Sequence, residues 1–222
     1  MTAHELDQDL LARAQGGQGP LVRVWEPREP AVVLGRSNRA EREAHLDACA
    51  ADGVPVLRRR GGGGAVVLAP GCLVASFARA VSRPLAVGTH MEEAVELLRR
   101  AVATAGGVGL NPAGTGDLCH GDRKVAGSSA FAGRGAFFYQ ASLLVDLDLA
   151  LVDRYLRHPS REPAYRRGRP HREFLTTLRR AGCRKPLEAL ARDLEAALAL
   201  TLGAVASEAQ HLADAPAIGR GR

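Results

Sequence analysis

The side chains best suited to chemistry gather in two short stretches of this chain. In the first, residues 58–77 (RRRGGGGAVVLAPGCLVASF), three arginines run directly into four glycines. Glycines let backbone N–H groups converge on one point and let a ligand approach the chain closely. The arginines add fixed positive charge beside that point. The stretch predicts either a site for an elongated, partly anionic ligand or a β-bulge beside a solvated basic strand end.

The second stretch, residues 121–129 (GDRKVAGSS), contains Lys124, one of only two lysines in the chain. A lysine on a half-buried strand is costly unless it has a partner. Its ammonium group can hold a carboxylate or an acyl phosphate oxygen as a point charge. The alternative is a surface lysine beside a hairpin turn.

Four cysteines, Cys49, Cys72, Cys119 and Cys183, could supply a nucleophile or serve as small buried hydrophobes. No two of them have the spacing of metal ligands. The N-terminal residues are polar and acidic, unlike a signal peptide, and no apolar run reaches the roughly 18 residues of a membrane helix. We therefore expect a cytoplasmic protein with reduced thiols and no membrane partner.

Composition narrows the class of partner. The 222 residues are 46% hydrophobic but only 4% aromatic, so leucine, valine and alanine must fill most of the core. The net charge of +6 suits an acidic protein, a phosphate-bearing ligand or nucleic acid. Nucleic acid is the least favoured of these, because no aromatic residues interleave the arginine runs.

Apolar patterns predict strands that flank both stretches, over residues 21–27, 31–35, 54–58, 65–69, 72–78 and 136–146. We expect the strands at 65–69 and 72–78 to pair through a turn at Pro70-Gly71. Residues 117–130 predict a hairpin whose second arm breaks at Gly127, preceded by a loop at 111–116. The glycine run lies between two strands, which argues against a P-loop or dinucleotide fingerprint, where glycines open a helix.

Helical patterns cover residues 4–14, 39–52, 148–157, 171–180 and 186–202. The clearest helix should begin at Thr89, as N-cap of a capping box with Glu92, and end near Gly106. A basic, proline-punctuated loop occupies residues 158–171. This order predicts one α+β domain with a mixed sheet, a core over about 5–180 and a helical tail over about 181–205.

Together these stretches resemble the lipoate–protein ligase A family. The first resembles its motif R-R-x-S-G-G-G-A-V-x-x-x-x-G-N-L-x-x-S-F, and DLCHGDRKVAGSSA resembles N-D-L…G-x-R-K-x-x-G-S-A. Segments 23–38 and 141–159 extend the similarity, in order, over about residues 5–180. The resemblance implies the catalytic fold shared by biotin ligases, lipoate ligases and octanoyltransferases. Residues 1–222 would form one such domain, without the C-terminal accessory domain of many ligases.

The resemblance also implies roles for individual residues. Lys124 matches the lysine that binds the carbonyl of an acyl-adenylate, and Arg59 the arginine that contacts the adenylate. Asp117 matches the acidic residue near the nucleotide and its metal. The other matching positions are the glycine-loop backbone, Gly62, Gly63, Gly64 and Ala65, and the turn after the lysine, Gly127 and Ser128. The sequence departs from the motifs at Gly61 (family Ser), Gly116 (family Asn) and Gln140 (family His).

The implied activity is that of a lipoate–protein ligase. With ATP and Mg²⁺ it would convert lipoate or octanoate to an acyl-adenylate, then acylate a lysine of a lipoyl domain. The implied acceptors are the acyl-carrying subunits of 2-oxo acid dehydrogenases and the glycine cleavage H protein. A separate accessory chain is a further implied partner, and we expect the basic 161–171 segment to help dock an acidic acceptor domain.

Two other functions stay open at this point. One is an octanoyltransferase that takes acyl groups from acyl carrier protein without ATP. The other is a non-catalytic lipoyl- or acyl-binding module. The 107–116 segment, where we expect the nucleophile of a cysteine-dependent transferase, contains no cysteine, which favours the ligase.

Overall fold

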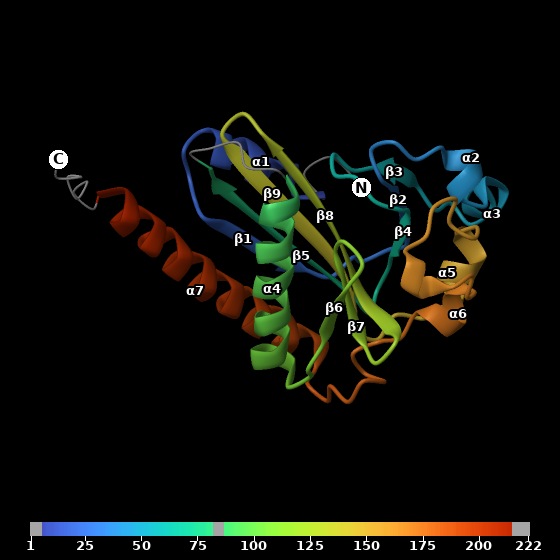
Figure 1. The fold of residues 1–222 in the computed structure, drawn as a ribbon. Helices are drawn as coiled ribbons and strands as arrows, with labels where there is room; N and C mark the ends of the chain where they lie inside the picture. Colours follow the sequence, from blue (N-terminus) through green and yellow to red (C-terminus); the bar gives the residue numbers. More distant parts are fainter. Residues whose placement is uncertain (1–5, 82–86, 215–222) are drawn as a thin grey trace.

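The computed structural model describes residues 6–81 and 87–214, with side chains to residue 204, and places the strands in two sheets (Figure 1). In the larger sheet every neighbouring pair is antiparallel. In the smaller, β2 is parallel to β3 and antiparallel to β4. The larger sheet has the order β1 (Leu21–Trp25), β5 (Cys72–Ala80), β9 (Ala136–Leu144), β8 (Arg123–Gly133), β7 (Asp117–His120), β6 (Asn111–Ala113), and the smaller the order β3 (Val56–Arg58), β2 (Ala31–Leu34), β4 (Val66–Leu68).

Helices cover the two sheets unequally. The two long helices, α4 and α7, pack on one face of the large sheet (Figure 1). Helix α1 packs on the other face, against β5 and β9, and the short helices gather near the small sheet. The bounds are α1 (Gln8–Gln15), α2 (Ala40–Glu43), α3 (Leu46–Ala51), α4 (Val87–Gly106), α5 (Ala150–Tyr155), the 3-10 helix η2 (Ala164–Arg166), α6 (His171–Phe174) and α7 (Leu187–Asp214).

The expected α+β class is confirmed, with the strands divided between two sheets rather than one. Strands β4 and β5 do not form the expected pair, because β4 joins the small sheet and β5 the large one. Gly71 redirects the chain between them with a φ of +87°. Its carbonyl accepts hydrogen bonds from Val145 N and Asp146 N, which fixes this turn on the end of β9 rather than on β4.

Several expected helix bounds are wrong, and the helix expected over 186–202 continues to Asp214. Helix α4 begins at Val87, so Thr89 lies inside it and is not an N-cap. The expected 39–52 helix is two helices, because Ala44 is extended and bridges Leu156. The expected 171–180 helix stops at Phe174, because Leu175 becomes extended and bridges Lys124 beside the large sheet.

The hairpin before β9 also differs from expectation. Strand β8 continues through Gly127 to Gly133, so neither Gly127 nor Ser128 lies in a turn. Residues 111–113 are not loop but the short edge strand β6, paired with β7. Within the described ranges no helix is both long and apolar enough to cross a membrane.

Candidate functional site

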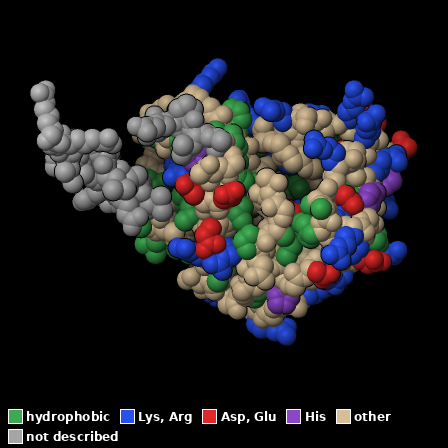
Figure 2. Space-filling view, viewed as in Figure 1, with side chains coloured by type: hydrophobic (Ala, Val, Ile, Leu, Met, Phe, Trp, Pro, Cys, Tyr) green, Lys and Arg blue, Asp and Glu red, His purple; other side chains and the backbone are tan. Residues whose placement is uncertain are grey.

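A cavity of about 560 Å³ opens on the face of the large sheet that α4 and α7 leave uncovered, opposite the small sheet. Figure 2 shows the molecule hollowed there, between β8 and β4. This volume is in the range of small-molecule sites. All nine residues expected from the sequence line this one cavity: Arg59, Gly62, Gly63, Gly64, Ala65, Asp117, Lys124, Gly127 and Ser128.

The cavity lining combines apolar side chains with charged ones. Valine and leucine side chains come from the small sheet, β5, β9 and α5, namely Val33, Val66, Val67, Leu68, Val74, Leu144 and Val152. Lys124 and Asp117 come from the β7–β8 hairpin. A molecule with an apolar chain and a charged end matches this combination.

A β-bulge places Lys124 on the cavity face. Cys119 pairs with Lys124 while Leu118 pairs with Ala126, so Val125 is an extra residue in β8. Such an insertion changes which face later side chains point to. Because of it, Lys124 shares a face with Gly127 although the two are three residues apart.

Gly127 gives the lysine room to lie along the strand. A Cβ atom at Gly127 would lie 2.6 Å from Lys124 Nζ. Any side chain there would therefore push the ammonium group out of its position.

The lysine is paired in the cavity wall. Lys124 Nζ lies 2.7 Å from Asp117 Oδ1, and the two side chains are 23% and 15% exposed. Tyr165 donates a hydrogen bond from its hydroxyl to the other carboxylate oxygen, Oδ2, at 2.7 Å. The partner that a half-buried lysine requires is thus a carboxylate held by a phenol.

Arg59 holds the glycine loop from within. Its guanidinium donates to the carbonyls of Gly62 and Gly64, at 2.6 and 2.8 Å from Nη2, and to that of Val33. The residue is 8% exposed, and burial lowers the pKa of its guanidinium to about 10. Arg59 lines the cavity, and each of its three side-chain nitrogens already donates to one of these carbonyls.

Two glycines of the loop have different constraints. Gly63 has a φ of +91°, a conformation that side chains rarely adopt, and an added Cβ would lie 3.0 Å from Arg59 Nη2. At Gly64 an added Cβ would meet no atom within 4 Å. Gly63 is therefore needed for the backbone, whereas Gly64 leaves space on the cavity side.

Ser128 lines the cavity, but its hydroxyl is engaged elsewhere. Its Oγ lies 2.5 Å from the hydroxyl of Tyr139, which belongs to the core under α4. We therefore expect its backbone, rather than its side chain, to face a ligand.

All four cysteines are buried and free. Burial raises the pKa of the Cys72 thiol to about 12 and that of Cys119 above its usual value. Cys119 donates to Tyr165 Oη at 3.6 Å rather than lining the main cavity. Buried thiols with raised pKa values are poor nucleophiles.

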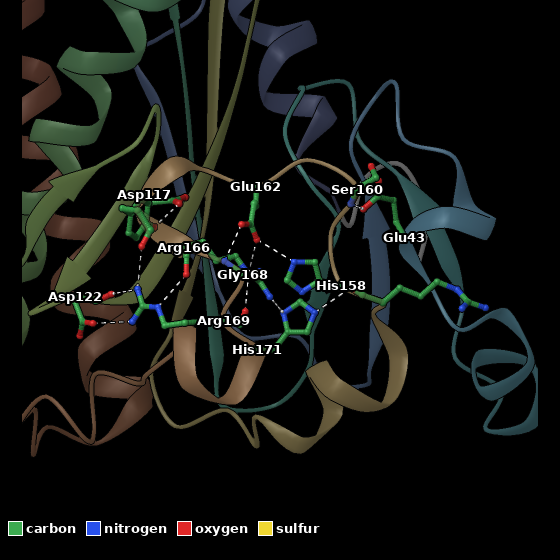
Figure 3. A network of polar contacts seen from close by, with 12 residues as sticks. Glu43, Asp117, Asp122, His158, Ser160, Glu162, Arg166, Gly168, Arg169 and His171 are labelled. Atoms are coloured by element: carbon green, nitrogen blue, oxygen red, sulfur yellow. Dashed lines mark hydrogen bonds and ion pairs between the residues drawn. The ribbon is translucent and has the colours of Figure 1, made fainter.

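The 158–171 loop forms a wall of the cavity that the sequence did not predict. Glu162, Arg166 and His171 line the cavity, and Arg166 contacts both of the others (Figure 3). The loop is tied to the hairpin by Arg169, which binds Asp122 at 2.7 Å. The only sequence signal for this wall was a polar segment with prolines.

Arg166 cannot serve as a docking residue for an acidic partner. It is buried, its guanidinium lies 4.7 Å from the Phe174 ring, and its Nε donates to the Arg169 carbonyl. Arg167, in contrast, is exposed. The part of the loop that faces solvent is smaller than the sequence suggested.

Metal ligands are sparse in this site. In the described part of the chain no group of three or more His, Cys, Asp or Glu side chains could hold an ion. Asp117 is the candidate carboxylate, and both its oxygens have partners. Mg²⁺ commonly binds one or two carboxylates together with substrate phosphates, so Asp117 fits only as a single ligand to a phosphate-bound ion.

Comparisons with known proteins cover most of the chain. Residues 1–199 match the model of the lipoyl protein ligase A/B catalytic domain. The octanoyltransferase LipM of Symbiobacterium thermophilum is 30% identical over 215 residues, which are 84% of this chain and 76% of that protein.

Solved structures share the fold. Lipoate-protein ligase A bound with ATP superposes with a TM-score of 0.76 at 23% identity, over 89% of this chain and 78% of that one. A bi-partite lipoate protein ligase of Thermoplasma acidophilum, studied with its E2 lipoyl domain, gives a TM-score of 0.72 at 22% identity. That match covers 87% of this chain and 76% of the other. At these identities the similarity establishes the fold.

Proposed function

Since this chain belongs to the lipoyl protein ligase A/B catalytic domain family, we propose that it is an ATP-dependent lipoate–protein ligase. It would activate lipoate or octanoate as an acyl-adenylate and attach the acyl group to a lysine of a lipoyl domain. The observation that carries this proposal is the cavity lining. Lys124 is present in it, and no cysteine is among the described residues that form it.

The chemistry explains why such a lining suits a ligase. A free carboxylate is a poor electrophile, because attack on it would have to expel oxide. Attack of the carboxylate on the α-phosphate of ATP releases pyrophosphate and gives a mixed anhydride. The amine of the acceptor lysine then attacks the carbonyl, and AMP leaves. None of these steps needs an enzyme nucleophile, so the protein contributes positioning and charge.

Lys124 would provide that charge. In the structure its ammonium is held by Asp117. An anionic acyl phosphate competes with the carboxylate for the same ammonium, which is a point charge on a flexible stem. Lys124 would then hold the carbonyl oxygen as negative charge develops on it, while the apolar side chains of the cavity hold the acyl chain.

Arg59 would act through the glycine loop. Because it binds the carbonyls of Gly62 and Gly64, it holds the loop in a fixed shape beside the cavity. The loop N–H groups can then face the ligand without a side chain in the way. A direct contact of Arg59 with the adenylate would use its second Nη1–H or replace one of these hydrogen bonds.

ATP, Mg²⁺ and partner chains enter this proposal by similarity. A protein of the same fold is known with ATP bound. Mg²⁺, when bound, would offset phosphate charge, and Asp117 is the residue that would hold it. The archaeal relative is bi-partite and was studied with an E2 lipoyl domain. We accordingly propose lipoyl domains as acceptors and a separate accessory chain for the catalytic domain formed by residues 1–222.

A direct test is formation of AMP. We expect the purified protein to release AMP and pyrophosphate from ATP only when octanoate or lipoate is added, and Lys124→Ala to lose this activity. If neither acid stimulates AMP formation, with or without a lipoyl domain, the ligase proposal fails.

An ATP-independent octanoyltransferase is the second candidate, because the relative at 30% identity carries that name. It needs a nucleophile or direct acyl transfer from a carrier protein. Cys119 is the nearest cysteine to Lys124, and it is buried with a raised pKa. Transfer from octanoyl acyl carrier protein without ATP, lost in Cys119→Ser, would favour this candidate. Acyl binding with neither activity would favour a binding module.

A further inference from the structure

Behind the lysine–carboxylate pair lies a tyrosine from a distant part of the chain. Tyr165 belongs to η2 in the 158–171 loop, and its hydroxyl donates to Asp117 Oδ2 at 2.7 Å. It does not line the main cavity. It lines a neighbouring one of about 440 Å³, together with Cys119 and Arg169. We propose that Tyr165 is a positioning residue, which fixes the Asp117 carboxylate so that its other oxygen aims Lys124 into the cavity.

The loop holds this tyrosine in a defined place. Its ring packs against Phe174 with centroids 5.2 Å apart. Arg169 donates to the Tyr165 carbonyl and also binds Asp122, at the turn of the β7–β8 hairpin. Figure 3 shows the contact of Arg169 with Asp122, which joins the loop to the hairpin. The hydroxyl is thus delivered to Asp117 by contacts that do not depend on Asp117 itself.

Proton positions favour donation toward the carboxylate. A carboxylate oxygen only accepts, so the Tyr165 hydroxyl is the donor in its 2.7 Å contact with Asp117 Oδ2. The Cys119 thiol in turn donates to the Tyr165 oxygen at 3.6 Å. Both hydrogen bonds therefore run in one direction, from Cys119 through Tyr165 to Asp117.

This arrangement matters when the lysine changes partner. Under the proposed function, on which the kinetic part of this inference rests, Lys124 leaves Asp117 Oδ1 for an acyl carbonyl. Asp117 then keeps its bond to Tyr165 and stays in place for the return of the lysine. Without the hydroxyl, the carboxylate can rotate, and the ammonium loses its fixed starting point.

The chain provides a matched control for the test. Tyr155 donates from its hydroxyl to Asp52 Oδ2 at 2.8 Å, and neither residue lines the cavity. Each of Tyr165→Phe and Tyr155→Phe removes one oxygen and keeps the ring. For Tyr165→Phe we expect kcat for acyl transfer to fall about 10- to 100-fold, with the KM for the acyl acid changed less than about threefold. Tyr155→Phe should stay within about twofold of the wild type.

The positioning role can also be tested without measuring catalysis, by chemical labelling of lysines, because the chain has only two of them. Lys185 also pairs with a carboxylate, Asp193, but outside the cavity. Limited acetylation followed by peptide mass measurement gives the ratio of Lys124 to Lys185 labelling. We expect Tyr165→Phe to raise this ratio about threefold or more by loosening the pair, and Tyr155→Phe to leave it unchanged.

The double variant decides whether Tyr165 acts through Asp117. If it does, Tyr165→Phe should change the labelling ratio little in an Asp117→Asn background. An unchanged ratio in the single Tyr165→Phe variant, or equal effects in both backgrounds, would overturn the inference. If the wild type forms no AMP and transfers no acyl group, the proposed function fails, while labelling still tests the positioning role.

Discussion

The two faces of the large sheet differ although they are made by the same strands. Residues of β5 and β9 alternate, so that Leu73, Phe77 and Phe137 pack under α4 and α7. Their neighbours Ser76 and Gln140 point the other way and bond to each other. The helix face is filled by apolar side chains, whereas the other face holds buried polar groups and a cavity.

This difference separates stability from chemistry. An apolar face against two helices stabilises the fold by burial alone. A charged pair such as Lys124–Asp117 contributes little to stability once desolvation is counted, so we expect its place in the cavity to serve the chemistry. Variants on the helix face should accordingly lose stability, whereas variants in the cavity should lose activity.

The largest effect is expected at Lys124. Lys124→Ala should reduce acyl transfer by about 10³-fold or more, because Lys124 carries the only ammonium among the described residues that line the cavity. Its melting temperature should stay close to that of the wild type. Lys124→Arg should not restore activity, since a planar guanidinium does not replace an ammonium in a tight site. Transfer by Lys124→Ala at the wild-type rate would contradict the assignment, and Lys185→Ala is the control.

On the helix face the loss should be in stability. Leu98 belongs to α4 and is fully buried against the large sheet, and Leu98→Ala should lower the free energy of unfolding by about 3 kcal/mol. Urea denaturation measures this. Transfer per folded molecule should be unchanged at low temperature. If Leu98→Ala kept normal stability but lost activity, the two faces of the sheet would not separate stability from chemistry.

The glycine loop sharpens the comparison within one segment. Gly64→Val should weaken binding of the acyl-adenylate or its analogues about tenfold, with little change in melting, because the added side chain enters the cavity without strain. Gly63→Ala should instead destabilise the protein by about 1 kcal/mol or more, because of its positive φ. Ligand titration beside thermal melting compares them. Equal affinity with a lower melting temperature in Gly64→Val would make its role structural.

The smallest effect is expected at the solvent-exposed part of the 158–171 loop. Arg167 directly follows η2 and is exposed. Arg167→Glu should weaken the binding of an acidic lipoyl domain about two- to fivefold at low salt. The difference should vanish near 0.5 M salt. Arg192→Glu, an exposed position on α7, changes the net charge equally and should have no effect. Identical affinities of the two variants for the lipoyl domain would show that the loop takes no part in acceptor docking.

The sequence predicted the site better than it predicted its surroundings. Lys124, Asp117 and the glycine loop lie in contiguous motifs, so their presence could be read directly, and they do line one cavity. The bulge at Val125 that turns Lys124 to this face leaves no local signal, and neither does the bridge of Leu175 to Lys124. Both depend on strand pairing between distant segments.

Tyr165 was missed for the same reason. It lies 48 positions from Asp117 along the chain, in a segment whose prolines and arginines predict only a loop. The capping box at Thr89 failed in the opposite way: its local pattern was correct in form, but the helix begins earlier, at Val87. Local patterns identify chemistry-bearing groups, and tertiary pairing decides what supports them.

Intact mass of the acceptor tests the central claim most directly. The protein is incubated with a lipoyl domain and octanoate, Mg²⁺ and ATP, and in parallel with octanoyl acyl carrier protein without ATP. We predict an octanoyl adduct on the lipoyl domain in the first reaction only, absent with Lys124→Ala and retained with Cys119→Ser. An adduct formed efficiently in the second reaction, and lost with Cys119→Ser, would contradict the ATP-dependent account.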